Sequence, residues 1–200
     1  MDIILASGSP RRRELLTAMG VRDFQIVIPD FDERSVGPFP PADLVRRLAV
    51  GKGRAAVAMV GEDTLVIAAD TVVALDDEVL GKPRSEEEAK DMLRRLSGRT
   101  HRVFTGVTAM RQGRESTHYV CTEVTFRALT EEEISNYVRT GEPMDKAGAY
   151  GIQGVGAQLV SSISGDYFNV MGLPVCTLAE MLRHFGVDTL ALAAERGADA

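Results

Sequence analysis

The chain opens with a short apolar strand that turns directly into a helix. Residues 3–6 are apolar and predict a buried strand, and Ser7-Gly8-Ser9-Pro10 leads from this strand into the helix. Ser9 can cap the helix, and Pro10 can be its first residue, where the missing N–H costs nothing. A strand followed at once by a helix is the building unit of α/β proteins, so the segment favours that fold class.

Three arginines occupy the first turn of this helix, namely Arg11, Arg12 and Arg13. A helix N-terminus is the positive end of the helix dipole and favours anions, so three cations there are costly unless an anion binds. Together with the hydroxyls of Ser7 and Ser9, the segment has the composition of a phosphate site. A solvated arginine face on an ordinary strand–turn–helix unit is the alternative that the spacing leaves open.

The rest of the chain alternates predicted strands and helices, which indicates a mixed α/β fold. Capping patterns of the Ser/Thr-x-x-Glu kind predict helix starts at Ser85 and Thr130. The strands are predicted at 24–28, 65–75, 79–80, 103–110 and 119–127, with a last hairpin from 157–163 and 167–170; the helices are predicted at 43–59, 85–97, 130–141 and 178–185. No linker divides the chain, and we expect the residues 186–200 to fray.

Composition limits the partners of the chain. Its 200 residues carry a formal net charge of −6, which argues against a nucleic-acid polymer, because such binding requires a broad basic surface. An anion must therefore be held locally, and a small, multiply charged ligand fits best. The two cysteines, Cys121 and Cys176, show neither zinc-site nor disulfide spacing, and we read neither a signal peptide nor a membrane span. We therefore expect a cytoplasmic protein with no membrane partner.

Asp70 lies inside the most apolar run of the chain, residues 65–73. A carboxylate buried there without a partner is costly, so it requires a cation, a metal ion or a proton. One reading is that Asp70 pairs with a lysine purely to stabilise the strand. The other is that it holds a divalent metal or activates water at the edge of a cleft.

Two lysines and one further carboxylate are candidates to accompany Asp70. Lys52 interrupts the apolar stripe of the helix at 43–59, where it either extends to solvent or points into a cleft, and Lys82 lies in a tight Gly-Lys-Pro turn. Nearby cations would keep Asp70 ionised and make it a poor proton acceptor, so we favour the role of metal ligand first and general base second. Glu33 is the candidate second carboxylate, with a solvated loop charge as the alternative.

Several common catalytic patterns are missing from the sequence. It contains no P-loop, no dinucleotide-binding glycine pattern after a strand and no nucleophile-elbow serine. Its three histidines, His101, His118 and His184, lack metal-ligand spacing.

Five segments together nevertheless resemble one known family, the Maf nucleotide pyrophosphatases, also called septum formation inhibitor proteins. The segments are residues 6–16, 69–73, 81–83 with 96–101, 145–154 and 169–174. They occur in the family's order, and the resemblance runs from about residue 3 to residue 185. It implies a single domain over 1–185 with two lobes, similar to the inosine triphosphate pyrophosphatases, and an active-site cleft between the lobes.

The resemblance also implies an activity and the residues that carry it. The activity is hydrolysis of a nucleoside triphosphate to the monophosphate and pyrophosphate, with Mg²⁺ or Mn²⁺. The family's catalytic aspartate, described as a proton acceptor, falls on Asp70. Its phosphate-binding and charged residues fall on Ser7, Ser9, Arg12, Glu33, Lys52 and Lys82.

Three positions separate the branches of the family. The branch similar to dTTP/UTP pyrophosphatases carries Arg, Thr and Gln at the positions of Arg11, Thr71 and Gln153, and the 7-methyl-GTP branch carries Trp, Gln and Glu. A glutamine can meet a pyrimidine edge with both a donor and an acceptor, which a glutamate cannot. We therefore expect a dTTP/UTP pyrophosphatase. A 7-methyl-GTP pyrophosphatase and a nucleotide-binding regulator of cell division are the alternatives, and a homodimer is left open.

Overall fold

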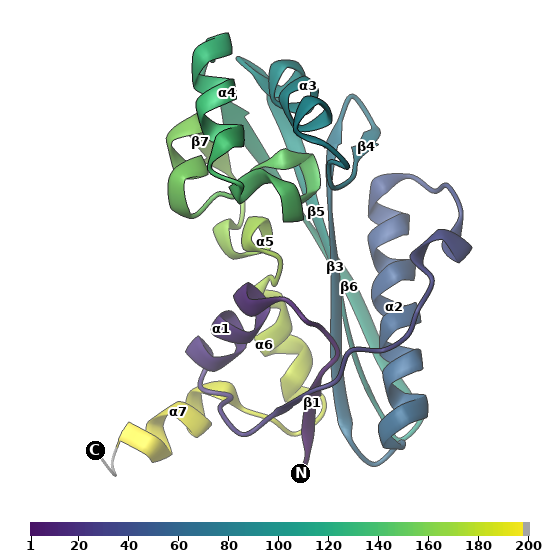
Figure 1. Cartoon of the computed structure of the whole chain (residues 1–200). Helices are drawn as coiled ribbons and strands as arrows, with labels where there is room; N and C mark the ends of the chain where they lie inside the picture. Colours follow the sequence, from purple (N-terminus) through teal and green to yellow (C-terminus); the bar gives the residue numbers. More distant parts are fainter. Residues whose placement is uncertain (198–200) are drawn as a thin grey trace. The chain divides into compact units, whose positions relative to one another are not determined.

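The computed structural model describes residues 1–197, and within them seven strands form one mixed sheet (Figure 1). The sheet order is β2-β1-β3-β5-β6-β7, with β4 paired to β3. The strands are β1 (Ile3–Leu5), β2 (Gln25–Ile26), β3 (Leu65–Leu75), β4 (Glu78–Leu80), β5 (Thr100–Arg111), β6 (Arg114–Phe126) and β7 (Val160–Ser164). The α-helices are α1 (Pro10–Ala18), α2 (Pro41–Val60), α3 (Glu86–Leu96), α4 (Glu131–Arg139), α5 (Tyr167–Met171), α6 (Val175–Arg183) and α7 (Thr189–Gly197). The 3₁₀ helices are η1 (Glu33–Val36), η2 (Glu142–Asp145), η3 (Ala147–Ala149) and η4 (Gly154–Leu159). The predicted mixed α/β class is confirmed.

The chain divides into two compact units. Unit 1 comprises Met1–Asp70, Thr105–Val120 and the residues from Gly172 onward, and unit 2 comprises Thr71–Phe104 and Cys121–Met171. In the part of the chain that the structure describes, none of the helices has the length and apolar character needed to cross a membrane.

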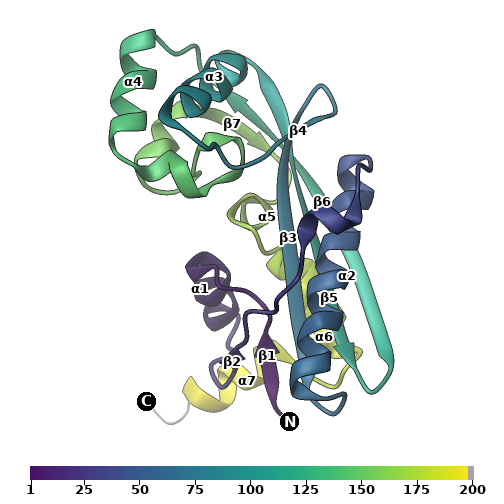
Figure 2. The ribbon, with the colours of Figure 1, turned by 45° about the vertical axis from the view of Figure 1, so that its right-hand side comes forward.

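The core of unit 1 lies between its parallel strands and α2. β1 is parallel to both β2 and β3, and the small side chains at Ala6, Ala56 and Ala68 pack with Ile4 and Val66. Strands of a parallel sheet are covered by crossover helices, which explains their continuous apolar character. In Figures 1 and 2, α1 and α2 lie on either side of β3.

A glycine in β5 allows α2 to approach the sheet closely. A Cβ atom added at Gly106 would lie 2.2 Å from the backbone oxygen of Val45 in α2, a separation that no side chain tolerates. The close approach fixes where α2 lies against the strands of unit 1, and so where the side chains of α2 point.

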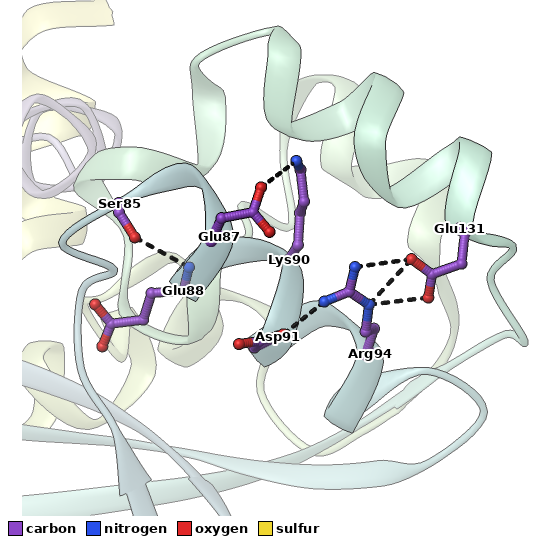
Figure 3. Close-up of polar contacts among 7 residues, drawn as sticks. All are labelled: Ser85, Glu87, Glu88, Lys90, Asp91, Arg94 and Glu131. Carbon is purple, nitrogen blue, oxygen red and sulfur yellow. Dashed lines mark hydrogen bonds and ion pairs between the residues drawn. The ribbon is translucent and has the colours of Figure 1, made fainter.

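In unit 2, α3 and α4 are joined by charged side chains (Figure 3). The Arg94 guanidinium donates to both carboxylate oxygens of Glu131, with distances of 2.9 Å from Nε to Oε1 and 2.9 Å from Nη2 to Oε2. Hydrogen bonds from Arg94 to Glu131 and Asp91 raise the pKa of Arg94. Bidentate geometry of this kind fixes orientation as well as charge, so the pair sets how the two helices meet.

The two predicted capping patterns differ in the structure. Thr130 forms the full reciprocal capping box with Glu133. The Ser85 hydroxyl accepts from the Glu88 N–H at 3.2 Å, but the Glu88 carboxylate accepts instead from the Arg84 N–H at 2.7 Å. Both helix starts are nevertheless confirmed, because the serine or threonine half of each pattern is sufficient to cap the helix.

The predicted strand at 167–170 is wrong, because this segment forms α5. The Asp166 carboxylate accepts from the Phe168 N–H at 2.8 Å, which favours a helical turn. The buried Asn169 side chain donates to Val103 O at 3.0 Å and to Thr122 Oγ1 at 2.9 Å. A four-residue segment is too short for its pattern to separate a strand from a single helical turn, and here the tertiary contacts of Asn169 decide.

The sequence led us to expect residues 186–200 to fray; residues 189–197 form α7, and residues 198–200 lie outside the described part of the chain. The Asp188 carboxylate begins α7 by accepting from the N–H groups of Leu190 and Ala191 at 3.0 and 3.2 Å. A Cβ added at Gly20 would lie 2.7 Å from the backbone oxygen of Thr189. The start of α7 therefore packs closely on the residues that follow α1.

A buried histidine lies in the core of unit 2. His101 is 2% exposed, its Nε2 lies 2.8 Å from the Tyr150 hydroxyl, and its ring meets the rings of Phe126 and Tyr150 edge-on. Burial lowers the pKa of His101 to about 4. The histidine is therefore neutral at physiological pH and structural rather than a metal ligand.

This histidine makes stability depend on pH. Between about pH 6.5 and pH 4 the unfolded chain binds a proton at His101 that the folded chain does not, so the free energy of unfolding falls as the pH falls through this window. We expect His101 to contribute a loss of about 2 kcal/mol between about pH 7 and pH 5. Urea unfolding of the wild type and of His101→Gln at both pH values measures this contribution. Between the two pH values, the free energy of unfolding should fall by about 2 kcal/mol less in the variant than in the wild type. Equal losses in both proteins would contradict the assignment.

Candidate active site

The candidate site lies at the carboxyl end of β1. The chain leaves β1 through α1 to reach β2 on one side, and α2 then leads to β3 on the other side of β1. Such a reversal of strand order opens a crevice beyond the carboxyl ends of parallel strands, where ligands of open α/β sheets bind. The residues that follow Leu5 therefore occupy a binding position by topology alone.

The loop after β1 holds the predicted serines in defined roles. The Ser9 hydroxyl accepts from the Arg12 N–H at 3.5 Å and is the N-cap of α1, with Pro10 in the first turn. The Ser7 hydroxyl accepts from the Ser9 N–H at 3.3 Å and from Nη1 of Arg12 at 3.1 Å. The first turn of α1 contains no acidic residue. The predicted cap is confirmed, and the positive end of α1 meets no acid within its own first turn.

Arg12 is fixed at two points of its guanidinium group. Besides its bond to Ser7, Nε donates to the backbone oxygen of Gly172 at 2.8 Å. Burial lowers the pKa of Arg12, whereas the nearby carboxylates of Asp70 and Glu33 act in the opposite direction. A guanidinium remains charged in proteins, so a partly desolvated cation with a set orientation lies close to Asp70.

Lys52 brings two of the predicted carboxylates together. Its Nζ donates to Oδ1 of Asp70 and lies 2.7 Å from Oε1 of Glu33. The Asp70 side chain is 10% exposed, whereas the Glu33 side chain is 57% exposed. The lysine that interrupts the apolar stripe of α2 therefore points to a buried carboxylate, which supplies the cation that Asp70 requires.

A glycine next to Lys52 explains how Glu33 reaches the cluster. A Cβ added at Gly51 would lie 2.2 Å from Cζ of Phe31, so the Phe31 ring rests where α2 has no side chain. A glycine inside a helix costs about 1 kcal/mol relative to alanine, and this contact is a packing reason for accepting that cost. Because η1 begins two residues after Phe31, the contact brings Glu33 near the ammonium of Lys52.

The carboxylates suit a divalent cation that is shared with a ligand. Asp70 and Glu33 converge on one ammonium group, so their carboxylate oxygens lie close together. Among residues 1–197, no group of three or more His, Cys, Asp or Glu side chains could hold a metal ion alone. Mg²⁺ is usually bound by one or two carboxylates together with substrate phosphates, so the donor set fits this mode and not a closed structural site.

The remaining predicted residues lie outside this cluster or beside it. Arg11 is half-buried on α1, and its charge lowers the pKa of the adjacent Arg12. Thr71 follows Asp70 on β3 and is half-buried, and it belongs to unit 2. Lys82 and Gln153 are exposed in loops of unit 2, so their assembly with Asp70 stays a prediction.

Sequence reasoning missed the contribution of Gly172. Its backbone oxygen orients Arg12, but a carbonyl acceptor leaves no trace in residue type. The only signal was that Gly172 falls within one of the five segments, residues 169–174, that resemble the family.

The chain is similar to proteins of one known family. The family described as Maf-like protein matches residues 2–185. A dTTP/UTP pyrophosphatase of Symbiobacterium thermophilum is 52% identical over 185 residues, which cover 92% of this chain and 94% of the relative. A dTTP/UTP pyrophosphatase of Bacillus cereus strain B4264 is 50% identical over 93% of this chain and 96% of the relative.

Two solved structures are also similar to the chain. A HAM1 protein from Coxiella burnetii matches with a TM-score of 0.47 and 16% identity, over 63% of this chain and 73% of that protein. The Ham1 protein of Staphylococcus aureus matches with a TM-score of 0.48 and 18% identity, over 80% of each chain. With the family match covering residues 2–185 and relatives about half identical over nearly the whole chain, the chain belongs to the Maf-like protein family.

Proposed function

We propose that the chain hydrolyses dTTP and UTP to the corresponding monophosphate and pyrophosphate. The observation that carries the proposal is the meeting of Lys52, Asp70 and Glu33 close to the oriented guanidinium of Arg12. Cations alone would suffice to hold a polyphosphate. A buried carboxylate beside them repels a polyphosphate and is useful only for chemistry or for holding a metal ion.

In the proposed reaction, water attacks the α-phosphorus and the bond to the β-phosphate oxygen breaks. The new P–O bond forms the monophosphate, and pyrophosphate leaves with the electron pair. Positioning and charge neutralisation account for most of the acceleration of such reactions. Arg12, Ser7 and Ser9 hold and orient the phosphates, together with Lys82.

Asp70 and Lys52 act as a pair in this scheme. Lys52 holds Asp70 through Oδ1, which sets the carboxylate's orientation. In this scheme Asp70 is first a metal ligand, and second it orients the attacking water and accepts its proton, a role for which a fixed carboxylate within hydrogen-bond reach is required. Asp70 and Glu33 would also hold Mg²⁺ or Mn²⁺, which neutralises phosphate charge when bound.

In this proposal, Arg11, Thr71 and Gln153 select the nucleobase of the substrate. The side-chain amide of Gln153 can donate to a carbonyl oxygen of thymine or uracil and accept from its N3–H. The two relatives described above carry the name dTTP/UTP pyrophosphatase, which supports the same substrates. Both cysteines are exposed and unpaired, which suits a cytoplasmic nucleotide pool.

Pyrophosphate release from a panel of triphosphates tests the proposal. The panel contains dTTP, UTP, CTP and 7-methyl-GTP, each with Mg²⁺, with Mn²⁺ and with excess chelator. We expect kcat/KM for dTTP and UTP to exceed that for 7-methyl-GTP by about 10²-fold or more, because the wrong base leaves polar groups unpaired. The chelator should abolish turnover. Activity confined to 7-methyl-GTP would refute the substrate assignment, and nucleotide binding without turnover would indicate a regulator instead.

A further inference from the structure

A carboxylate in unit 2 organises the loop that carries Gln153. Glu142, at the start of η2, accepts from the N–H of Val155 at 3.0 Å through Oε2 and from the N–H of Gly156 at 3.0 Å through Oε1. Successive backbone N–H groups form a concave site that suits an anion. In this loop the anion is supplied by the protein itself.

Tyr137 closes the other end of the same loop. Its hydroxyl donates to Oε1 of Glu142 at 2.9 Å and accepts from the N–H of Gly151 at 3.1 Å. Tyr137 is 4% exposed and lies on α4, so it is held by the core of unit 2. Glu142 and Tyr137 together therefore fix both ends of the segment from Gly151 to Gly156.

Two glycines of the loop leave no space for a side chain at their positions. Gly154 has φ +69°, and a Cβ there would lie 2.8 Å from Oε2 of Glu142. A Cβ at Gly156 would lie 2.3 Å from the backbone oxygen of Gly151 and 2.5 Å from the Tyr137 hydroxyl. The loop therefore closes directly onto the carboxylate and the phenol.

The charged form of Glu142 is the form that fits this loop. Burial alone would raise the pKa of Glu142, but its hydrogen-bond donors and the nearby ammonium of Lys146 hold the pKa below its ordinary value. An ionised carboxylate only accepts hydrogen bonds, which matches a set of donors. A glutamine amide in its place would direct an N–H₂ group at one of the backbone donors.

Between the two fixed ends, Ile152 is buried and Gln153 is exposed. The loop thus has an anchored side chain next to the one that the proposed function uses for base recognition. We propose that Glu142, through its bonds to Val155 and Gly156, is a positioning residue that sets the approach of Gln153 to the pyrimidine base. This inference rests on the proposed function, because it assigns Glu142 to the selection of that substrate.

Steady-state kinetics of Glu142→Gln with dTTP and UTP test the inference. We expect KM to rise about tenfold, as for the loss of one hydrogen bond to a charged group, while kcat stays within about twofold of the wild type. Glu132→Gln, an exposed glutamate on α4, is the matched control and should leave both constants unchanged. Hydrogen exchange at the amides of Val155 and Gly156 should accelerate in Glu142→Gln alone.

A double variant separates positioning from general destabilisation. If Glu142 acts through Gln153, Glu142→Gln should raise KM no further once Gln153→Ala is present. Additive effects, an unchanged KM or a loss confined to kcat would each overturn the inference. If Glu142→Gln does not fold, Gly154→Ala replaces it, because the added Cβ would lie against Oε2 of Glu142. This variant should show the same rise in KM. An unchanged KM in Gly154→Ala counts equally against the inference.

The wild-type assay keeps the two proposals apart. A wild type that does not turn over dTTP or UTP refutes the proposed function, and with it the role of Glu142 in selecting these substrates, whatever hydrogen exchange reports of the loop. An active wild type whose KM is insensitive to Glu142→Gln refutes only the positioning role.

Discussion

Asp70→Asn is expected to lower kcat for dTTP and UTP by about 10²- to 10⁴-fold, the range typical of a lost general base. Nucleotide affinity should stay largely intact, because the proposed phosphate ligands Ser7, Ser9 and Arg12 are untouched. Turnover is measured by pyrophosphate release and affinity by calorimetry in the presence of Mg²⁺. A fall in kcat without a matching fall in affinity is the result that a chemical role for Asp70 requires.

The Asp70→Asn variant should also fold. Asparagine has nearly the same shape as aspartate, and Lys52 keeps its ion pair with Glu33 at 2.7 Å. The buried ammonium is therefore not left without a counterion, which is the usual cause of collapse when one partner of a buried pair is removed. Circular dichroism and the thermal midpoint of the variant check this expectation.

A matched control is available on the helix that carries Lys52. Asp43 also forms an ion pair with a cation one turn away, Arg46, but lies outside the cluster. Asp43→Asn should leave kcat within about twofold, since partly exposed pairs contribute little. Full activity in Asp70→Asn would rule out the proposed chemistry, and a parallel loss of affinity would assign Asp70 to binding rather than to the reaction.

Much of this site could be predicted because it depends on residue type. Ser9 and Pro10 have strong positional preferences at helix starts, and the structure bears both out. Lys52 could be singled out because it breaks an apolar stripe, and Asp70 because it lies in an apolar strand. Each of these signals is a local conflict between residue and environment, which is where functional residues are expected.

Other parts of the site could not be predicted because they depend on backbone atoms or on the absence of a side chain. The carbonyl of Gly172 orients Arg12 from about 160 positions away in sequence, and any residue has a carbonyl. Gly51 contributes by lacking a Cβ beneath Phe31, and the sequence does not show which distant ring packs against a helical glycine. The contacts of Asn169 overrode the strand pattern at 167–170 for the same reason: they involve distant parts of the chain.

Arg12→Lys is expected to lower kcat/KM for dTTP and UTP by about 10²-fold, although it keeps the positive charge. The guanidinium of Arg12 donates to the Ser7 hydroxyl and to the Gly172 carbonyl, and both bonds depend on its planar fork of N–H donors, a fork that also matches the geometry of a phosphate. A lysine ammonium is a point charge on a flexible stem and cannot reproduce that geometry. The loss of kcat/KM should therefore exceed the loss caused by an arginine-to-lysine change at an ordinary surface position.

Arg13→Lys is the matched control for this prediction, because Arg13 lies in the same helical turn and is exposed. Its kcat/KM should stay within about twofold of the wild type. Ser7→Ala removes an acceptor that orients Arg12 and should lower kcat/KM about tenfold, the value of one hydrogen bond to a charged group. In the double variant Ser7→Ala/Arg12→Lys the losses should fall short of additivity, because both changes break the same contact. Equal losses in Arg12→Lys and Arg13→Lys would instead mean that only the total charge of the first turn matters, and the assignment of Arg12 as an oriented phosphate ligand would be wrong.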